Sequence, residues 1–251
     1  NPSNYSYREP VKESALSLTK HLNETAKRLN NLQDDTLFSI DTMVKKANDI
    51  ASQISVLNTQ IYGIEIDGKS ANDLRDKREL LVDELSKIVN VKVDESAEGK
   101  YRVSISGISI VDHDYVNPIA YKREDPNDIN SKKLLQWDNG GKMKLKGGEL
   151  KGLIELVDGN GENGSYRGIP FYQGKLNDFA REFAEKFNSV HREGYGYKKD
   201  NNGIDFFTVK DEKNPALSIT VSDTILDDVG YIAVAKDDGN DVDDNRSLLD
   251  L

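Results

Sequence analysis

"GIEIDGKS", residues 63–70, is the stretch on which the interpretation of the fold depends. Its letters fit the phosphate-binding pattern G-x-x-x-x-G-K-[ST] from Gly63 to Ser70. In a true phosphate loop, a buried strand runs into the loop, and backbone N–H groups and the lysine hold the phosphates. The same letters also suit a turn between two helices, so the flanking sequence has to decide between the two interpretations.

The flanking sequence favours the turn. "ASQISVLNTQIY" (51–62) continues a helical pattern of apolar residues and is not an apolar strand. Glu65 and Asp67 would place two carboxylates against a triphosphate, and like charges repel. The chain also lacks the alternation of strands and helices that builds a parallel sheet. In the helical interpretation, Ser70 is the N-cap of the next helix and Asp73 completes a variant capping box.

Residues 11–62 are predicted to form one long helix, or two nearly continuous ones. Apolar or small residues recur at alternating gaps of three and four, which is the pattern of a coiled-coil seam. From Leu32 through Thr36 to Ile40 the seam steps twice by four, a stutter that locally unwinds a supercoil. The other seam positions are Val11, Ala15, Leu18, Leu22, Ala26, Leu29, Met43, Ala47, Ile50, Ile54, Leu57 and Ile61.

Further helices are predicted at 71–90, 147–159 and 170–193. The first of these carries a stripe of apolar residues, Leu74, Leu81, Leu85 and Ile88. The last carries an aromatic stripe that we interpret as core and not as a ligand site: Leu176, Phe179, Phe183, Phe187 and Val190. We expect Leu32, Ile54, Leu81, Leu85, Phe183 and Phe187 to be core residues.

Between and after these helices the apolar period changes to two, as in half-buried strands. Strands are predicted at 89–93, 101–106, 108–111, 116–121, 133–137 and 142–146. Short strands are also predicted at 205–209 and 217–221, and the acidic tail contains a further short element at 229–235.

The predicted fold class is α+β. It is an elongated α-helical bundle of long coiled-coil-like helices with a small inserted antiparallel β domain. Residues 1–94 and 147–195 would form the helical rod domain, and residues 95–146 the inserted domain. Residues 196–251 would return to the helical domain as short β segments and an acidic loop.

The composition argues against several kinds of function. The chain of 251 residues has no cysteine, so it has no disulfide, thiolate metal site or cysteine nucleophile. Its formal net charge is −10, and residues 223–251 hold nine Asp against two basic residues. No basic stripe is present for nucleic acid. No apolar run is long enough to span a membrane.

Two acidic stretches, "DGNGENG" (158–164) and "DDGNDVDDN" (237–245), suggest calcium. Both lack the closing glutamate of an EF-hand loop, so a solvated loop is favoured, with weak calcium binding at 237–245 left open. His21, His113 and His191 lie in different predicted elements, and no nucleophile or zinc motif is present. We therefore expect no active site, no cofactor and no metal centre.

Several stretches, in order along the chain, resemble the flagellar hook-associated protein 1 (FlgK) family. They are "VKESALSLTKHLNETAKRLNNLQDD" (11–35), "ANDLRDKRELLVDELSKIVNVKV" (71–93), "GGELKGLIELVDG" with "KLNDFAREFAEKFNSVHREGY" (147–195), "GIDFF" (203–207) and "DNRSLLDL" (244–251). The family-motif and core positions are Asn72, Asp73, Leu74, Asp76, Arg78, Leu81, Leu85, Phe183, Phe187, Asn188 and His191.

The resemblance implies a structural axial protein that forms the junction between the flagellar hook and the filament. Its partners would be the hook protein, the next hook-associated protein and further copies of itself in a ring. It would be extracellular, exported by the flagellar type III apparatus without a cleaved signal. The family's N-terminal segment and the C-terminal helix that pairs with it find no match, so we expect a core fragment, monomeric by itself, without the terminal polymerisation helices.

Two alternatives remain open at this point. One is a P-loop nucleotide-binding protein that uses Gly63–Ser70. The other is another flagellin-like or coiled-coil surface protein.

Overall fold

The computed structural model describes residues 7–125, 127, 128, 131–197 and 203–235. The chain forms two compact units, residues 33–168 and residues 1–32 together with 169–251. Strands β1 to β6 fall in the first unit, with the second half of α1, α2 and α3. The separation of 95–146 as an inserted domain stays a prediction. The acidic stretch 237–245 and the segment 244–251 lie outside the described residues.

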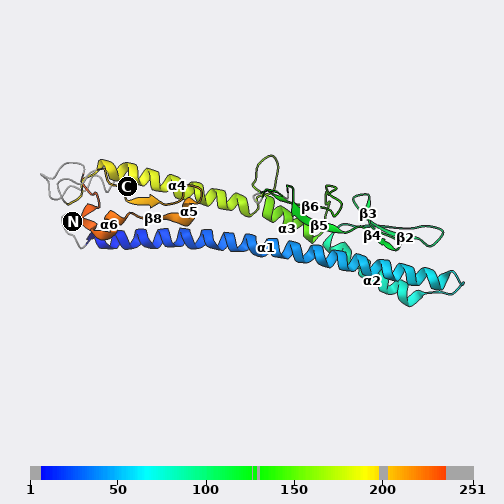
Figure 1. Ribbon diagram of the computed structural model, residues 1–251. Coiled ribbons are helices and arrows are strands. Elements are labelled where there is room, and N and C mark those ends of the chain that lie inside the picture. The colour runs from blue at the N-terminus through cyan, green and yellow to red at the C-terminus, as the bar shows by residue number, and fades with distance from the viewer. Residues whose placement is uncertain (1–6, 126, 129–130, 198–202, 236–251) are drawn as a thin grey trace. The chain divides into compact units, whose positions relative to one another are not determined.

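Helix α1 (Arg8–Glu65) is one unbroken helix of 58 residues, which decides between the two alternatives for 11–62 (Figure 1). Most seam positions are buried, as the pattern predicts, including Leu22, Ile40 and Ile54. Leu32 is 47% exposed, so its assignment to the core is wrong. The physical reason is that α1 contributes to one hydrophobic core up to Ala26 and to the other from Leu37 onward, and Leu32 lies between these two stretches.

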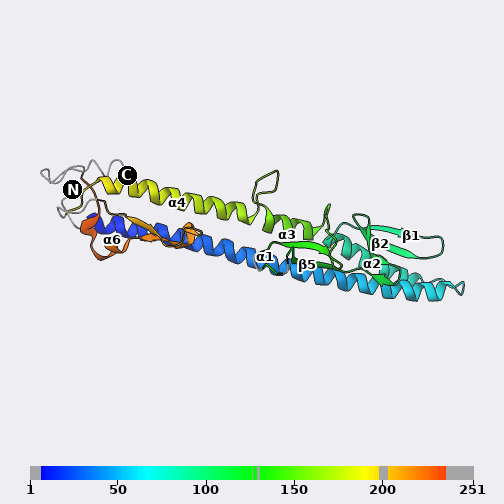
Figure 2. The same cartoon turned by 45° about the horizontal axis from the view of Figure 1, so that its top comes forward.

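In the unit of residues 33–168, helix α2 (Asn72–Ile88) folds back along the last turns of α1 (Figure 2). The two helices share one core, to which α1 contributes Ile50 and Ile54 and α2 contributes Val82 and Leu85. Helix α2 begins and ends within two residues of the predicted 71–90, which follows from its apolar stripe.

The same core continues into the strands. β1 (Lys92–Glu95), β2 (Tyr101–Ile105), β3 (Ile108–Asp112) and β4 (Tyr115–Val116) form an antiparallel sheet in that order. β5 (Ile119–Arg123) and β6 (Lys133–Trp137) form a separate antiparallel hairpin. In β2, Tyr101, Val103 and Ile105 are buried and the residues between them are not, as expected for one buried face. The predicted antiparallel arrangement is confirmed.

The strand predicted at 142–146 is wrong. Only an isolated bridge between Gln136 and Lys142 forms there. Two backbone groups of this segment bond to side chains instead: the Ser106 hydroxyl donates to the Lys144 carbonyl, and Asn90 Oδ1 accepts from the Lys146 amide. The strand predicted at 89–93 begins only at Lys92, because Val89 caps α2 and is buried.

Helix α3 (Glu149–Asp158) starts at a tightly constrained glycine. Gly148 has φ +95°, and a Cβ built there would lie 2.4 Å from the Ile88 carbonyl oxygen. Glycine is therefore required by both backbone conformation and space. This contact brings the start of α3 against the end of α2.

In the other unit, α4 (Ile169–Glu193) is followed by β7 (Phe207–Val209), α5 (Pro215–Ser218), β8 (Ile219–Val221), α6 (Asp223–Asp227) and the 3₁₀ turn η2 (Val229–Tyr231). Figure 1 shows the β7–β8 hairpin between the start of α1 and α4, and these elements share a hydrophobic core. The strands predicted at 205–209 and 217–221 are confirmed with shorter bounds. The second strand is shortened because Pro215 starts a helical turn there.

The aromatic stripe of α4 needs a correction. Phe179 is 51% exposed, and Phe183 and Phe187 are only partly buried against the core. Apart from Ile169 at the start of the helix, the buried positions of α4 are small or polar: Ala180, Ala184, Asn188 and His191. Small side chains let the backbone of β7 approach α4, and the two phenylalanines flank Phe207 with ring centroids 5.3 and 5.0 Å away.

The Gly148 contact gives a testable expectation. Gly148→Ala should destabilise the 33–168 unit by roughly 2–5 kcal/mol, because it adds backbone strain and a clash with the carbonyl of Ile88. Trp137, the only tryptophan and 2% exposed, reports unfolding of this unit by fluorescence in urea. The matched control is Gly152→Ala in α3, where nothing lies within 4 Å and stability should rise by about 0.5–1 kcal/mol. Equal effects of the two changes would contradict the assignment.

Candidate functional site

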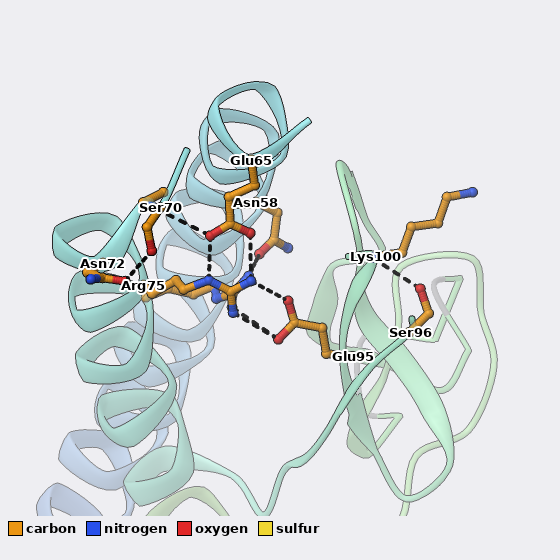
Figure 3. Close-up of polar contacts among 10 residues, drawn as sticks. Asn58, Glu65, Ser70, Asn72, Arg75, Glu95, Ser96 and Lys100 are labelled. Atoms are coloured by element: carbon orange, nitrogen blue, oxygen red, sulfur yellow. Dashed lines mark hydrogen bonds and ion pairs between the residues drawn. The ribbon is translucent and has the colours of Figure 1, made fainter. Parts of the chain in front are cut away.

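A polar cluster lies where the end of α1, the start of α2 and β1 come together (Figure 3). Arg75 donates from Nε and Nη2 to the two carboxylate oxygens of Glu65, both at 2.7 Å. Its Nη1 donates to Glu95 at 3.2 Å. The guanidinium of Arg75 holds the pKa of Glu65 below its ordinary value. Arg75 therefore joins the two helices to the edge of the sheet.

Arg78 lies deeper in the same place and is 1% exposed. Its Nη1 donates to Asn58 Oδ1 at 3.1 Å, and Nη2 lies 3.5 Å from the Glu95 carboxylate. The guanidinium carbon is 3.5 Å from the centre of the Tyr101 ring, a cation–π contact. Burial lowers the pKa of Arg78 and raises the pKa of Tyr101. The buried cation is thus held by α1, β1 and β2 together.

Asn58 extends this cluster into the sheet. It is 1% exposed, and its Nδ2 donates to the backbone carbonyl of His113 at 2.8 Å while its Oδ1 accepts from Arg78. Sequence reasoning missed Asn58. The available signal was its place on the buried stripe, one turn after Ile54 and three residues before Ile61.

The other family-motif positions of α2 lie on different faces of the helix, some exposed and some buried. Three polar positions lie on the exposed surface: Asn72, Asp73 and Asp76. Leu85 is fully buried, whereas Leu74 and Leu81 are only partly buried. Of the set chosen from the sequence in α2, the structure therefore brings Arg78 into the polar cluster and Leu85 into the core.

The stretch 63–70 is a turn between helices. Gly63 still belongs to α1, and Gly68 has φ +77°, a conformation that favours glycine. A helix precedes the stretch where a phosphate loop needs a strand. The predicted N-cap role of Ser70 is wrong, because its hydroxyl donates to Asn72 Oδ1 at 2.8 Å and Ala71 occupies the N-cap position without a side-chain cap.

A second polar site lies on α4, in the other unit. Asn188 is 6% exposed. Its Oδ1 accepts from the amides of Phe206 and Phe207, both at 2.9 Å, and its Nδ2 donates to the Phe207 carbonyl at 2.8 Å. One amide side chain therefore satisfies three backbone groups at the start of β7.

His191, one turn further along α4, is 1% exposed and binds two loops. The Ala233 amide donates to Nε2 at 2.9 Å, so the ring proton must be on Nδ1, which donates to the Ile204 carbonyl at 2.7 Å. Burial lowers the pKa of His191, and the ring is neutral. Phe187 stacks on it at 6.5 Å between centroids. Both ring nitrogens are therefore bonded to backbone groups, which is the environment of a structural link.

The same use of asparagine recurs elsewhere. Asn48 Nδ2 donates to the Ile119 carbonyl and its Oδ1 accepts from the Ile119 amide, at 2.8 and 2.9 Å. Asn90 Oδ1 accepts from the amides of Lys146 and Gly147. Neither residue was singled out from the sequence, because a lone polar residue beside an apolar seam carries no specific signal.

Within the described ranges, no group of three or more acidic or histidine side chains is placed to hold a metal ion. Asn160, in the stretch 158–164, instead bonds its neighbours Glu162 and Ser165. No helix among the described residues is long and apolar enough to cross a membrane. The polar sites described above join backbone segments to one another.

The sequence and the fold of this chain are similar to those of known proteins. The family described as "Flagellar hook-associated protein FlgK helical domain" matches residues 1–207. The chain belongs to the FlgK helical-domain family. All eleven motif and core positions chosen above lie within the matched residues of this FlgK-family chain.

Flagellar hook-associated protein 1 of Bacillus subtilis is 29% identical over 254 residues, covering 92% of this chain and 50% of the relative. The protein of the same name in Escherichia coli is 28% identical over 229 residues, covering 82% and 39%. The structure of the flagellar hook junction protein FlgK from Burkholderia pseudomallei has the same fold, with a TM-score of 0.65, 24% identity, and coverage of 82% of this chain and 37% of that one. The FlgK-family chain thus spans half or less of the length of these relatives.

We expect Arg78→Ala to destabilise the 33–168 unit by about 3–5 kcal/mol, since it leaves Asn58 and Glu95 without their buried partner. Arg78→Lys should recover only part of this, because an ammonium cannot reproduce the planar stacking on Tyr101. Urea unfolding followed by Trp137 fluorescence measures both. The control is Arg102→Ala, which removes an exposed pair with Asp112 and should cost no more than about 1 kcal/mol. A similar cost for Arg78→Ala and Arg102→Ala would refute the assigned role.

His191 makes stability depend on pH. Its pKa is lowered in the folded state, so the unfolded chain binds the extra proton first. Stability is complete above the ordinary histidine pKa and decreases below it, by up to about 1.4 kcal/mol per pH unit. We expect the unfolding free energy of the unit containing α4 to fall between about pH 7.5 and about pH 5.5. His191→Gln should remove the slope, and the exposed His21→Gln should keep it; the reverse would contradict the link.

Proposed function

We propose that this chain is part of a structural axial protein at the junction between the hook and the filament of a bacterial flagellum. The observation that carries the proposal is the family match over residues 1–207, together with the use of the motif residues in the fold. Arg78, Asn188 and His191 join helices to strands and loops, which is what a protein that transmits force without chemistry requires. The proposal includes the absence of catalytic activity and of a cofactor.

The partners follow from the same proposal. The whole protein would contact hook protein on one side and the next hook-associated protein on the other, and would assemble with copies of itself into a ring. This chain by itself would be a monomer. Its place would be outside the cell, reached through the flagellar type III apparatus without a cleaved signal. The relatives are named as flagellar hook-associated proteins, which supports a flagellar role for this chain.

The nucleotide-binding alternative has no support in the structure. Glu65 in the turn is bound by Arg75, and the element before the turn is a helix. No second function is therefore proposed.

Deletion of the gene that encodes this chain, in its own flagellated organism, tests the proposal. We expect cells with hooks and without attached filaments, with filament subunits in the medium and loss of swimming, because a missing junction leaves the filament without an attachment. The intact gene should restore swimming. Lys69→Ala should restore it fully, since Lys69 lies in a turn and holds no phosphate. Normal filaments in the deletion strain would refute the proposal, and failure of Lys69→Ala alone would revive nucleotide binding.

A further inference from the structure

The chain contains four Asn-Gly pairs, and this dipeptide is the one in which an asparagine side chain reacts most readily with the backbone after it. The pairs begin at Asn139, Asn160, Asn163 and Asn202, of which Asn202 lies outside the described residues. Glycine has no side chain to shield its nitrogen, so that nitrogen can approach the carboxamide carbon. Whether a pair reacts in the folded chain therefore depends on what already holds its carboxamide and its glycine N–H.

The pair Asn139–Gly140 is held in the turn after β6. The Gly140 N–H donates to the Trp137 carbonyl at 2.9 Å, so its proton is not free to be removed until this bond opens. Asn139 Oδ1 accepts from the Gly141 amide at 3.1 Å, which holds the carboxamide against a different backbone group. Both hydrogen bonds must open before the side chain and the glycine nitrogen react.

The pair Asn160–Gly161 lies at the start of the loop between α3 and α4. The Gly161 N–H donates to the Tyr166 carbonyl at 3.0 Å, across the loop. Asn160 Oδ1 accepts from the Glu162 amide at 3.0 Å and from the Ser165 hydroxyl at 2.8 Å. Its Nδ2 donates to the Glu162 carboxylate at 3.0 Å. Both ends of this carboxamide are therefore held, as is the nitrogen that would attack it.

The pair Asn163–Gly164 differs from the other two at both reacting groups. It forms the centre of a β-turn that the Ser165 N–H closes onto the Glu162 carbonyl at 2.8 Å. The φ angles of Asn163 and Gly164 are +50° and +79°, and positive φ at both central positions defines a type I′ turn. Both residues are exposed. Among the residues that the structure describes, neither the Asn163 side chain nor the Gly164 N–H has a hydrogen-bond partner.

We propose that Asn163 is a site of spontaneous deamidation and isoaspartate formation in the folded chain. Hydroxide removes the Gly164 N–H proton, and the nitrogen attacks Cγ of Asn163. The new C–N bond closes a succinimide ring, and the carboxamide nitrogen takes up a proton and leaves as ammonia. Water then adds to one of the two ring carbonyls and breaks its bond to nitrogen. Addition at Cγ gives aspartate, and addition at the backbone carbonyl gives isoaspartate.

The turn has to make one rotation to react. Types I′ and II′ differ in the orientation of the peptide plane between the two central residues, and type II′ brings the Gly164 nitrogen within reach of Asn163 Cγ. Glycine accepts the change in φ without steric cost, and nothing lies within 4 Å of a Cβ built at Gly164. The base of the loop can stay closed, since the Gly168 N–H donates to the Gly159 carbonyl at 2.8 Å. The reaction needs only water and is independent of the proposed axial role.

Incubation of the whole chain in mildly alkaline heavy-oxygen water tests the proposal. A protease that cuts after glutamate separates Asn160 from Asn163 at Glu162, and mass spectrometry locates the residue that has gained heavy oxygen. We expect product at Asn163 to form about ten-fold faster, or more, than at Asn139 or Asn160, because at least two hydrogen bonds must open first at each of those. Product at Asn139 or Asn160 that keeps pace with Asn163 would overturn the proposal.

The same measurement in urea is the control for local sequence. Once the fold and its hydrogen bonds are lost, the three pairs should react at similar rates, because each has glycine as its second residue. A preference for Asn163 that persists unchanged in urea would refute the structural cause. Asn163→Gln is the matched variant, since the longer side chain would have to close a larger and slower ring. It should abolish heavy oxygen at position 163 and leave the slow products at Asn139 and Asn160, and undiminished labelling at position 163 would contradict the succinimide route.

Discussion

The buried guanidinium of Arg78 is the constraint on which the 33–168 unit depends. A cation removed from water needs partners in fixed places, and here they come from α1 (Asn58), β1 (Glu95) and β2 (Tyr101). An apolar contact between helix and sheet would tolerate sliding, whereas these three contacts specify one position. The sheet is therefore set on the helical hairpin in a single register, at the cost of desolvating the charge.

Asparagine side chains solve the related problem of unpaired backbone. Short strands that lie on helices leave amides and carbonyls without a ladder partner, and such groups are costly when buried. Asn48 satisfies both groups of Ile119, and Asn188 satisfies three groups of Phe206 and Phe207. Because the donor and the acceptor of one amide group are fixed relative to each other, each asparagine also fixes the direction of the segment that it holds. Both units use this device, which explains why so much irregular backbone is tolerated beside the long helices.

The helices could be predicted from the sequence because apolar periodicity reports directly on a buried face; α1 and α2 follow it closely. The predictions that were wrong concern residues whose structure depends on tertiary contacts, which the apolar periodicity does not report. Leu32 continues the seam in sequence but lies where neither core extends. Residues 142–146 alternate like a strand, yet side chains of Ser106 and Asn90, distant in sequence, take the hydrogen bonds of Lys144 and Lys146. The polar cluster was recognised only through Arg78, since Asn58 and Glu95 acquire their roles only when α1, α2 and β1 meet.

The stretch 63–70 has a structural role in this chain. Glu65, whose carboxylate would repel a phosphate, instead forms an ion pair with Arg75 and so connects the end of α1 to α2. Of the motif positions chosen from the sequence, Arg78 and His191 are buried and their polar atoms are bound within the fold, whereas Asn72, Asp73 and Asp76 lie on the surface. Recognition of neighbours must therefore depend on what remains outside. On the described part of the 33–168 unit, α1 and α2 expose large apolar side chains, among them Phe38, Val56 and Leu80, and such side chains are where contact with another protein would release the most apolar surface from water.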